Sequence, residues 1–257
     1  MAHQPSRFFA EDLSSETVRL PREEAHHALR VLRLGVGAEL ELFDGYGNVA
    51  DGRIVEVTRQ AVDVGIEARR SLGPRPLPVV HVAFAVPKGK RLDWLLEKAT
   101  ELGAASLRPV VFQRSVAGAL AGRLAPAKRR RWTAHCVAAA KQSGLNWLPE
   151  IGDPMPLAEF LTQELFGAEG YFGVMGVAEG APGVRQVLAR APAGRDVCLL
   201  VGPEGGLTHA ELAGAAEAGF VPARLGRTVL RVETAAVALL AAVVAIHEAD
   251  GPPIGTG

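Results

Sequence analysis

The sequence predicts an α/β protein in which a small β-rich domain precedes a larger, mostly parallel α/β domain. Three observations lead to this prediction: short alternating stretches dominate residues 1–72, three prolines interrupt residues 74–78, and strands then alternate with helices. A chain of 257 residues is long enough for two domains. We place the first domain at residues 1–72, a stiff linker at 73–78, the second domain at 79–250 and a flexible tail at 251–257.

The first domain combines one short helix with alternating strands. Pro21 opens a helix that reaches about Val31, because proline fits a first helical turn and Glu23 and Glu24 favour its positive end. Strands are expected at residues 39–43, after the turn at 44–47 as far as residue 57, and at 61–66. These strands predict a small β-barrel or half-barrel.

The second domain shows the alternation that is typical of an open, mostly parallel sheet. Its strands are expected at residues 79–86, 107–112, 171–175 and 197–201, with a last short strand ending at Leu225. Its helices are expected at residues 91–102, 126–143, 209–218 and 233–248. Thr208 and Glu211 have the spacing of a capping box, which predicts where the third of these helices begins.

Charge is unevenly distributed, although 28 cationic and 28 acidic residues give a net charge of zero. Residues 85–150 contain 12 cationic and 4 acidic residues, a net charge of +8, whereas residues 1–72 carry −3 and residues 151–257 carry −6. A basic patch of this kind favours phosphate contacts. A solvated basic helix face has the same composition, so charge alone leaves the two interpretations about equal.

Several classes of protein are disfavoured. The two cysteines, Cys136 and Cys198, lack CxxC spacing, which argues against a disulfide framework or a structural zinc site. The longest apolar run, residues 235–246, is too short to span a bilayer. The first residues lack the apolar segment of a signal peptide. We therefore expect a cytoplasmic protein with no membrane contact and no metal.

The strongest local signal is the segment 199–208, LLVGPEGGLT, where a buried strand meets a capped helix. Ligands of open α/β sheets bind at such junctions. Gly202, Gly205 and Gly206 allow a ligand to approach the backbone closely. The segment matches neither GxGxxG nor the P-loop pattern, which disfavours ATP and GTP. An ordinary turn is the simpler alternative, but three glycines and a proline within five residues argue against it.

Charged residues mark three further segments. In residues 225–234, LGRTVLRVET, Arg231 and Glu233 precede or begin an apolar helix, so they either pair with each other, bind a ligand or merely favour the helix dipole. Residues 87–103 place three cations, Lys88, Lys90 and Arg91, between a strand and a helix, where they suit phosphate. Residues 140–144, AKQSG, offer polar groups that can bond a base or cap a helix.

Together these four segments resemble the RsmE family of ribosomal RNA methyltransferases, within the SPOUT (α/β-knot) superfamily. The resemblance covers about residues 6–248, and its most specific part is GPEGG at 202–206 combined with LR.ET at 230–234. Arg7-Phe8-Phe9 and the helix with His26-His27 resemble the family's PUA-like domain. Two positions depart from the family pattern, which usually has arginine at Thr228 and arginine or another polar residue near Leu145; Arg227 can supply the first guanidinium.

The resemblance implies a C-terminal trefoil-knotted α/β domain, with the knot at residues 171–176, 201–206 and 225–234, and a PUA-like β-barrel. It implies a homodimer that uses S-adenosylmethionine to methylate N3 of a uridine in 16S ribosomal RNA, free or in the assembled small subunit. The expected cofactor-binding residues are Gly176, Leu200, Gly202, Gly205, Gly206, Leu225, Gly226, Val229, Leu230, Arg231 and Thr234. The expected catalytic residues are Arg231 and Glu233. The expected RNA-binding residues are Arg7, Arg30, Arg33, Lys88, Lys90, Arg91 and Gln142.

Two other functions stay open at this stage. One is a SPOUT methyltransferase that modifies another RNA site, because the loop motifs do not distinguish substrates. The other is a non-catalytic RNA-binding protein of ribosome assembly, which the departure at Thr228 permits.

Overall fold

The protein consists of two compact units. The computed structural model describes residues 5–76, 78–115, 122–163, 170–192 and 194–247. Unit 1 comprises residues 1–75 and 140–148, and unit 2 comprises residues 76–139 and 149–257. The division falls inside the proline-rich segment, but residues 140–148, which we predict within the second domain, group with the first. The expected tail at 251–257 lies outside the described residues.

Unit 1 is built on a five-stranded sheet with the order β1-β3-β4-β5-β2. Its strands are β1 (Ser6–Phe9), β2 (Thr17–Arg19), β3 (Glu39–Phe43), β4 (Asn48–Val57) and β5 (Val62–Ser71). β1 pairs with β3 in parallel, and the other pairs are antiparallel. Helix α1 (Arg22–His26) continues into the π-helical turn η1 (His27–Val31). The three predicted strands and the predicted helix are confirmed.

Alternation along the strands of unit 1 places one face in a hydrophobic core. Leu40 and Leu42 of β3 and Ile54 of β4 are almost completely buried, and they pack with Phe8 of β1 and Ala25 of α1. Burial of such side chains contributes about 1.5–3 kcal/mol each to the free energy of unfolding. The core thus fixes the register of β1, which carries Arg7.

Unit 2 contains a parallel sheet with the order β12-β10-β11-β6-β7-β8, and β9 also pairs with β7. Its strands are β6 (Val80–Ala85), β7 (Ser106–Val111), β8 (Glu150–Ile151), β9 (Met155–Pro156), β10 (Phe172–Val177), β11 (Val197–Val201) and β12 (Phe220–Arg224). Its helices are α2 (Lys90–Glu101), α3 (Pro126–Ser143), α4 (Leu157–Leu161), α5 (Val184–Leu188), α6 (His209–Glu217) and α7 (Val232–His247). The last residues of α3, from Ala140, group with unit 1.

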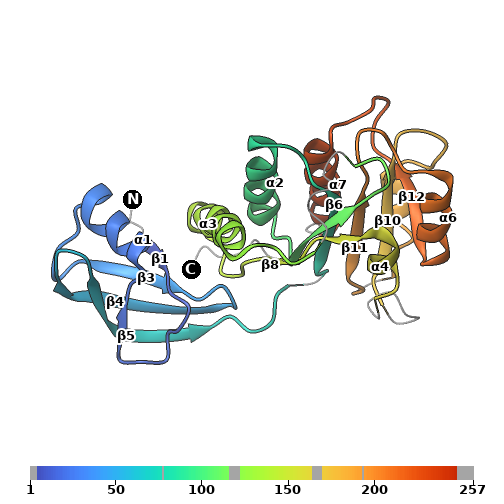
Figure 1. The fold of residues 1–257 in the computed structure, drawn as a ribbon. Coiled ribbons are helices and arrows are strands. Elements are labelled where there is room, and N and C mark those ends of the chain that lie inside the picture. The colour runs from blue at the N-terminus through green and yellow to red at the C-terminus, as the bar shows by residue number, and fades with distance from the viewer. Residues whose placement is uncertain (1–4, 77, 116–121, 164–169, 193, 248–257) are drawn as a thin grey trace. The chain divides into compact units, whose positions relative to one another are not determined.

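Helices cover the parallel sheet of unit 2. α2 packs against α7, and α7 also contacts β6 and β11, whereas α6 contacts β12 and α4. In Figure 1, α2 and α7 lie on one side of the strands and α6 lies on the other. The strands β6 and β11 are buried along nearly their whole length, as expected for a parallel sheet covered by helices. The predicted alternation of strands and helices is confirmed.

Both cysteines lie in the core of unit 2, which leads to a first testable prediction. Burial raises the pKa of the Cys198 thiol to about 12 and that of the Cys136 thiol to about 11. Because the thiolate is the reactive species, we expect neither thiol of the folded protein to react with a chromogenic disulfide reagent at pH 8. Both should react in concentrated guanidinium chloride. Rapid reaction of one thiol in the folded protein would contradict its burial.

Candidate functional site

The carboxyl ends of four strands in unit 2 meet at one edge of the sheet. In the register of the sheet, Gly176 of β10 lies beside Val201 of β11 and Ala223 of β12, and Val201 lies beside Phe84 of β6. Because all four strands are parallel, the segments that follow them leave the sheet at the same edge. The structure therefore brings together Gly176, the glycine-rich loop and the segment that begins at Leu225, as the sequence motifs require.

The glycine-rich loop (Gly202–Leu207) joins a fully buried strand to a well-capped helix. Gly206 has a φ of +69°, its N–H donates to the Pro203 carbonyl at 2.8 Å, and no atom lies within 4 Å of the position of an added Cβ. The predicted capping box is confirmed, because Thr208 N–H donates to Glu211 at 2.8 Å and Glu211 N–H donates to Thr208 at 3.3 Å. Exposed backbone groups are therefore held in a fixed turn.

Two contacts from other elements hold this loop, and a third holds the start of the helix that follows it. Arg114, in the segment after β7, donates from Nη1 to the Gly205 carbonyl at 2.9 Å. The N–H of Gln113 donates to Glu211 Oε1 at 2.7 Å, so Glu211 joins this segment to the start of α6. Arg91 of α2 pairs with Glu204 at 3.3 Å. The loop is thus fixed by the segments after β7 and β6.

At Gly205 the absence of a side chain leaves room for Arg114, and the backbone angles of Gly205 do not themselves require glycine. A Cβ added at Gly205 would lie 3.3 Å from the Cβ of Arg114, which is tighter than nine in ten real Cβ contacts and would require Arg114 to shift by a few tenths of an ångström. The φ of Gly205 is not among the positive values, so conformational strain is not the reason for glycine here. Arg114 is not among the residues that the sequence motifs indicate, because its only local signal is its place after a strand that ends at the same edge of the sheet.

The second motif, residues 225–234, leads from β12 to α7. Gly226 has a φ of +78° and open space beside its Cα atom. Val229 is 71% exposed, Arg231 is exposed, and the Arg231 carbonyl accepts the first hydrogen bond of α7 from Ala235 N–H at 2.8 Å. The guanidinium of Arg231 therefore stands at the beginning of the helix and faces solvent.

Glu233 lies in the first turn of α7 and is only 6% exposed. Its Oε2 atom is buried and has no hydrogen-bond partner within the described residues. No ion pair joins it to Arg231 in the part of the chain that the structure describes. Because an unpaired buried carboxylate is costly, the interpretation that Glu233 serves a ligand is favoured over internal pairing.

The cations predicted to bind RNA fall in both units. In unit 2, Lys88 and Lys90 are exposed on either side of Gly89, the residue before α2, whereas Arg91 is engaged with Glu204. In unit 1, Arg30 and Arg33 are exposed, and Arg33 has a φ of +55°. Gln142 is exposed near the end of α3. An RNA contact at these residues stays a prediction.

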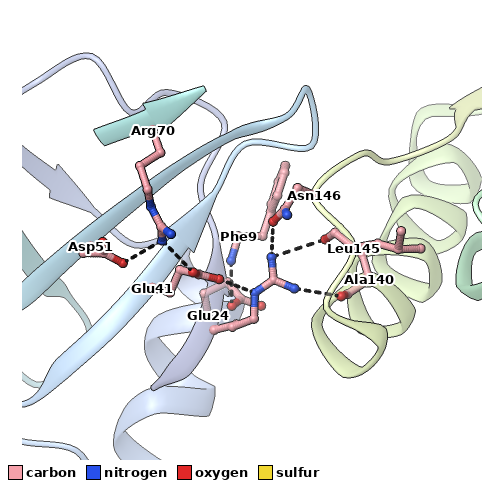
Figure 2. Close-up of polar contacts among 9 residues, drawn as sticks. Phe9, Glu24, Glu41, Asp51, Arg70, Ala140, Leu145 and Asn146 are labelled. Carbon is pink, nitrogen blue, oxygen red and sulfur yellow. Dashed lines mark hydrogen bonds and ion pairs between the residues drawn. The ribbon is translucent and has the colours of Figure 1, made fainter. Parts of the chain in front are cut away.

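Arg7, which we expected to bind RNA, has its side chain buried inside unit 1 and is not exposed as most of the other predicted RNA-binding cations are. Its side chain is 8% exposed and its Nε donates to Glu41 at 2.6 Å. Its remaining contacts go to Ala140, Leu145 and Asn146 of the same unit, and Figure 2 labels these three partners. Because these partners occupy the guanidinium, a phosphate contact of Arg7 is not proposed further.

Two family models match the chain along most of its length. A model described as an RNA methyltransferase domain matches residues 74–244, and one described as an RNA methyltransferase PUA domain matches residues 20–67. The parallel sheet with its glycine-rich edge and the mixed sheet of unit 1 thus correspond to the two domains of an RNA methyltransferase.

Proteins with similar sequences and structures indicate which family of RNA methyltransferases this chain belongs to. Ribosomal RNA small subunit methyltransferase E of Synechocystis is 30% identical over 93% of this chain and 76% of its own length, and that of Mycobacterium bovis is 35% identical over 86% and 83%. A solved structure of the Neisseria gonorrhoeae enzyme of this name, bound to S-adenosylmethionine, is 28% identical with a TM-score of 0.80 and covers 95% of this chain and 98% of its own. A Legionella pneumophila methyltransferase solved with the same cofactor is 27% identical with a TM-score of 0.81 and covers 95% and 98%. The chain belongs to the ribosomal RNA small subunit methyltransferase E family.

The residues at the sheet edge fit S-adenosylmethionine. Gly206 and Gly226 leave backbone groups open to close approach by the cofactor, and Glu233 Oε2, buried without a partner among the described residues, offers a hydrogen-bond acceptor at the start of α7. Among the described residues, no group of three metal-ligating side chains is found, and no described helix is long and apolar enough to cross a membrane.

Proposed function

We propose that this protein transfers the methyl group of S-adenosylmethionine to N3 of a uridine in 16S ribosomal RNA. The observation that carries the proposal is Glu233 at the start of α7: its Oε2 atom is buried and has no hydrogen-bond partner among the described residues. The exposed Arg231 precedes it by two residues, and the segment before α7 leaves the same sheet edge as the glycine-rich loop. The names of the relatives and the cofactor in two similar structures support it.

The backbone of the sheet edge would hold the cofactor. Peptide groups of Leu200, Gly202, Leu225 and Leu230 would bond the adenine and ribose, and Gly205 and Gly206 would border the methionine part. Gly176, Gly226, Val229 and Thr234 would complete the wall of the site. When bound, S-adenosylmethionine supplies an electrophilic methyl group on a sulfonium centre. The chain's contribution is to orient the uracil for in-line displacement, which is the largest catalytic effect available to it.

Glu233 would accept the proton of uracil N3, and Arg231 would stabilise the negative charge that this leaves on the ring. N3 of neutral uracil carries a proton that must leave as the new N–C bond forms. Glu233 Oε2 is an acceptor without a protein partner among the described residues, so it can take this proton. The exposed guanidinium of Arg231 can stabilise negative charge on a neighbouring uracil oxygen. A flipped or single-stranded uridine would give both side chains access to N3.

Four features of the resemblance remain part of the proposal. β12 lies at one edge of the sheet, whereas α7, which follows it, packs against β6 and β11 in the middle; this return supports a trefoil knot. The mixed sheet of unit 1 supports a PUA-like barrel. Partly exposed small residues of α7, together with Ile246, support a homodimer. Two reduced, buried cysteines agree with action in the cytoplasm.

The proposal is tested by incubating the purified protein with methyl-labelled S-adenosylmethionine and small ribosomal subunits, and by identifying the labelled nucleoside by mass spectrometry. We expect N3-methyluridine in 16S RNA. A different methylated nucleoside would indicate another RNA site, and RNA binding without transfer would indicate a non-catalytic protein. Titration calorimetry with S-adenosylmethionine, ATP and NAD checks the cofactor, and only the first should bind.

Arg114 provides a second test of the cofactor site. Arg114→Ala removes the hydrogen bond to the Gly205 carbonyl, and a bond from a charged group contributes about 1.5–3 kcal/mol. Because the glycine-rich loop would then be less ordered, we expect the Kd for S-adenosylmethionine to rise about tenfold. Arg108→Ala, which removes an exposed pair with Glu150, is the matched control and should leave the Kd unchanged. Equal affinities of wild type and Arg114→Ala would contradict the role of Arg114.

A further inference from the structure

Residues 140–148 form part of unit 1 although more than sixty residues separate them from Arg75. Tryptophan and leucine side chains of this segment pack on the turn between β3 and β4. Added Cβ atoms would lie 2.6 Å from Trp147 at Gly47 and 2.8 Å from Leu148 at Gly45. Gly47 N–H donates to the Asn146 carbonyl at 2.9 Å, and Leu148 N–H donates to the Gly45 carbonyl at 2.8 Å. The later half of the segment is therefore fixed on the sheet.

Arg7 of β1 joins both halves of the segment. Its Nη1 donates to the Ala140 carbonyl at 3.3 Å, and its Nη2 donates to the Leu145 carbonyl at 3.3 Å and to Asn146 Oδ1. Nε pairs with Glu41, which also binds Arg70, as Figure 2 shows. One planar guanidinium thus holds both ends of residues 141–144, a turn that consists of the last three residues of α3 and Gly144.

A second buried ion pair holds the turn from α1. Lys141 Nζ lies 2.7 Å and 3.0 Å from the two carboxylate oxygens of Glu24, and its ammonium lies 4.9 Å from the centre of the Phe8 ring. The side chains of this pair are only 16% and 12% exposed. Ion pairs of this kind contribute little net stability. Here two partly buried pairs, Arg7–Glu41 and Lys141–Glu24, connect the end of α3 to β1, β3 and α1.

The tip of this turn is polar and exposed. Gln142, Ser143 and Gly144 are all exposed, and Gly144 has a φ of +78°. A glutamine amide carries both a donor and an acceptor, which can bond the edge of an unpaired base. Glycine lets a nucleotide approach the backbone.

We propose that Gln142–Gly144 is a base-reading element of unit 1 for single-stranded ribosomal RNA, and that Arg7 and Lys141 are its positioning residues. The proposal rests on the proposed function and extends it to the recognition of the RNA. Gln142 touches the base, whereas Arg7 acts only by holding the turn. The segment between two strands of unit 2 thereby supplies a recognition element to unit 1.

The test measures the KM for small ribosomal subunits, the kcat and the Kd for S-adenosylmethionine. We expect Gln142→Ala to raise the KM about tenfold without changing the Kd or the melting temperature. Arg7→Lys, which keeps the charge but not the planar fork of donors, should raise the KM by a similar factor.

A double-mutant cycle separates positioning from general destabilisation. If Arg7 acts through the turn, Arg7→Lys combined with Gln142→Ala raises the KM no further than Gln142→Ala alone. Additive effects would overturn the positioning role. Arg70→Lys is the matched control, because Arg70 shares Glu41 with Arg7 but, among the described residues, its ion pairs go to Glu41 and Asp51 and not to residues 140–148. The KM of Arg70→Lys should equal that of the wild type. Should Arg7→Lys fail to fold, Asn146→Ala removes one acceptor and replaces it in the cycle.

The same variants distinguish this proposal from the proposed function. If no RNA is methylated, the enzyme assignment fails, and filter binding of 16S RNA then measures the contact directly. Weaker binding by Gln142→Ala would retain the recognition element without the reaction. If Gln142→Ala changes neither RNA binding nor the KM, the proposed recognition element at Gln142–Gly144 is wrong.

Discussion

Glu233→Gln is expected to lower kcat by at least about a hundredfold, because a positioned general base contributes about 10²–10⁴ to a rate. Glutamine has nearly the same shape as glutamate, so the packing around α7 should be kept. The side chain is buried and its Oε2 has no partner within the described residues, so replacement by a neutral amide should leave the melting temperature unchanged or raise it. A loss of activity without a loss of stability would identify a chemical role.

The pH dependence gives this prediction a second readout. Without the carboxylate, removal of the N3 proton depends on hydroxide, so the kcat of Glu233→Gln should rise steadily with pH and approach that of the wild type. Glu217→Gln, at an exposed position of α6, is the matched control and should behave as the wild type. An unchanged kcat for Glu233→Gln would contradict the proton transfer and leave Arg231 as the residue that stabilises the uracil anion.

Gly205→Val is expected to weaken the binding of S-adenosylmethionine between about tenfold and a hundredfold, from an overpacking cost of about 1–3 kcal/mol. From the sequence alone, the expected reason is that a side chain would occupy ligand space. The structure adds a nearer obstacle, because the new Cβ would lie 3.3 Å from Arg114 Cβ. The loop residues Glu204, Gly205 and Gly206 are exposed, so the melting temperature should change little. Calorimetric titration measures the Kd.

A second substitution separates the two reasons for the Gly205 effect. If the obstacle is Arg114, Gly205→Val combined with Arg114→Gly should bind S-adenosylmethionine no more weakly than Arg114→Gly alone. If the obstacle is the ligand, the two effects should add. Gly35→Val is the control, because its Cβ meets no atom within 4 Å and its φ is not positive. A Kd of Gly205→Val equal to that of the wild type would contradict the assignment of the site.

The longer elements were predictable because their patterns extend over several residues. The alternating pattern predicted both ends of the strand Glu39–Phe43 correctly, and the continuous apolar run did the same for Val197–Val201. β1, β2, β8 and β9 were not predicted, because strands of two to four residues are too short for a period to be recognised. The capping box at Thr208 was predicted because it is a local hydrogen-bond pattern.

The candidate site was predictable only where it depends on strand ends. Motifs that follow parallel strands must share an edge, so the approach of Gly176, Gly202 and Leu225 could be expected. The contact between Arg114 and Gly205 joins residues 91 positions apart and leaves no local pattern. The surroundings of Arg7 could not be predicted for the same reason. Its acceptors come from distant parts of the chain, so the sequence around Arg7 does not indicate that it is buried.

The discontinuous chain of unit 1 has a consequence for biosynthesis. A ribosome synthesises residues 1–75 well before residues 140–148, so during that interval Phe43 and Val49 lack their packing partner Ala140, and Arg7 lacks three of its acceptors. Unit 1 cannot reach its final structure in order of synthesis, as continuous domains do. Its last folding step must wait for a segment encoded within the second half, and a nascent chain arrested before residue 148 would expose an incomplete core.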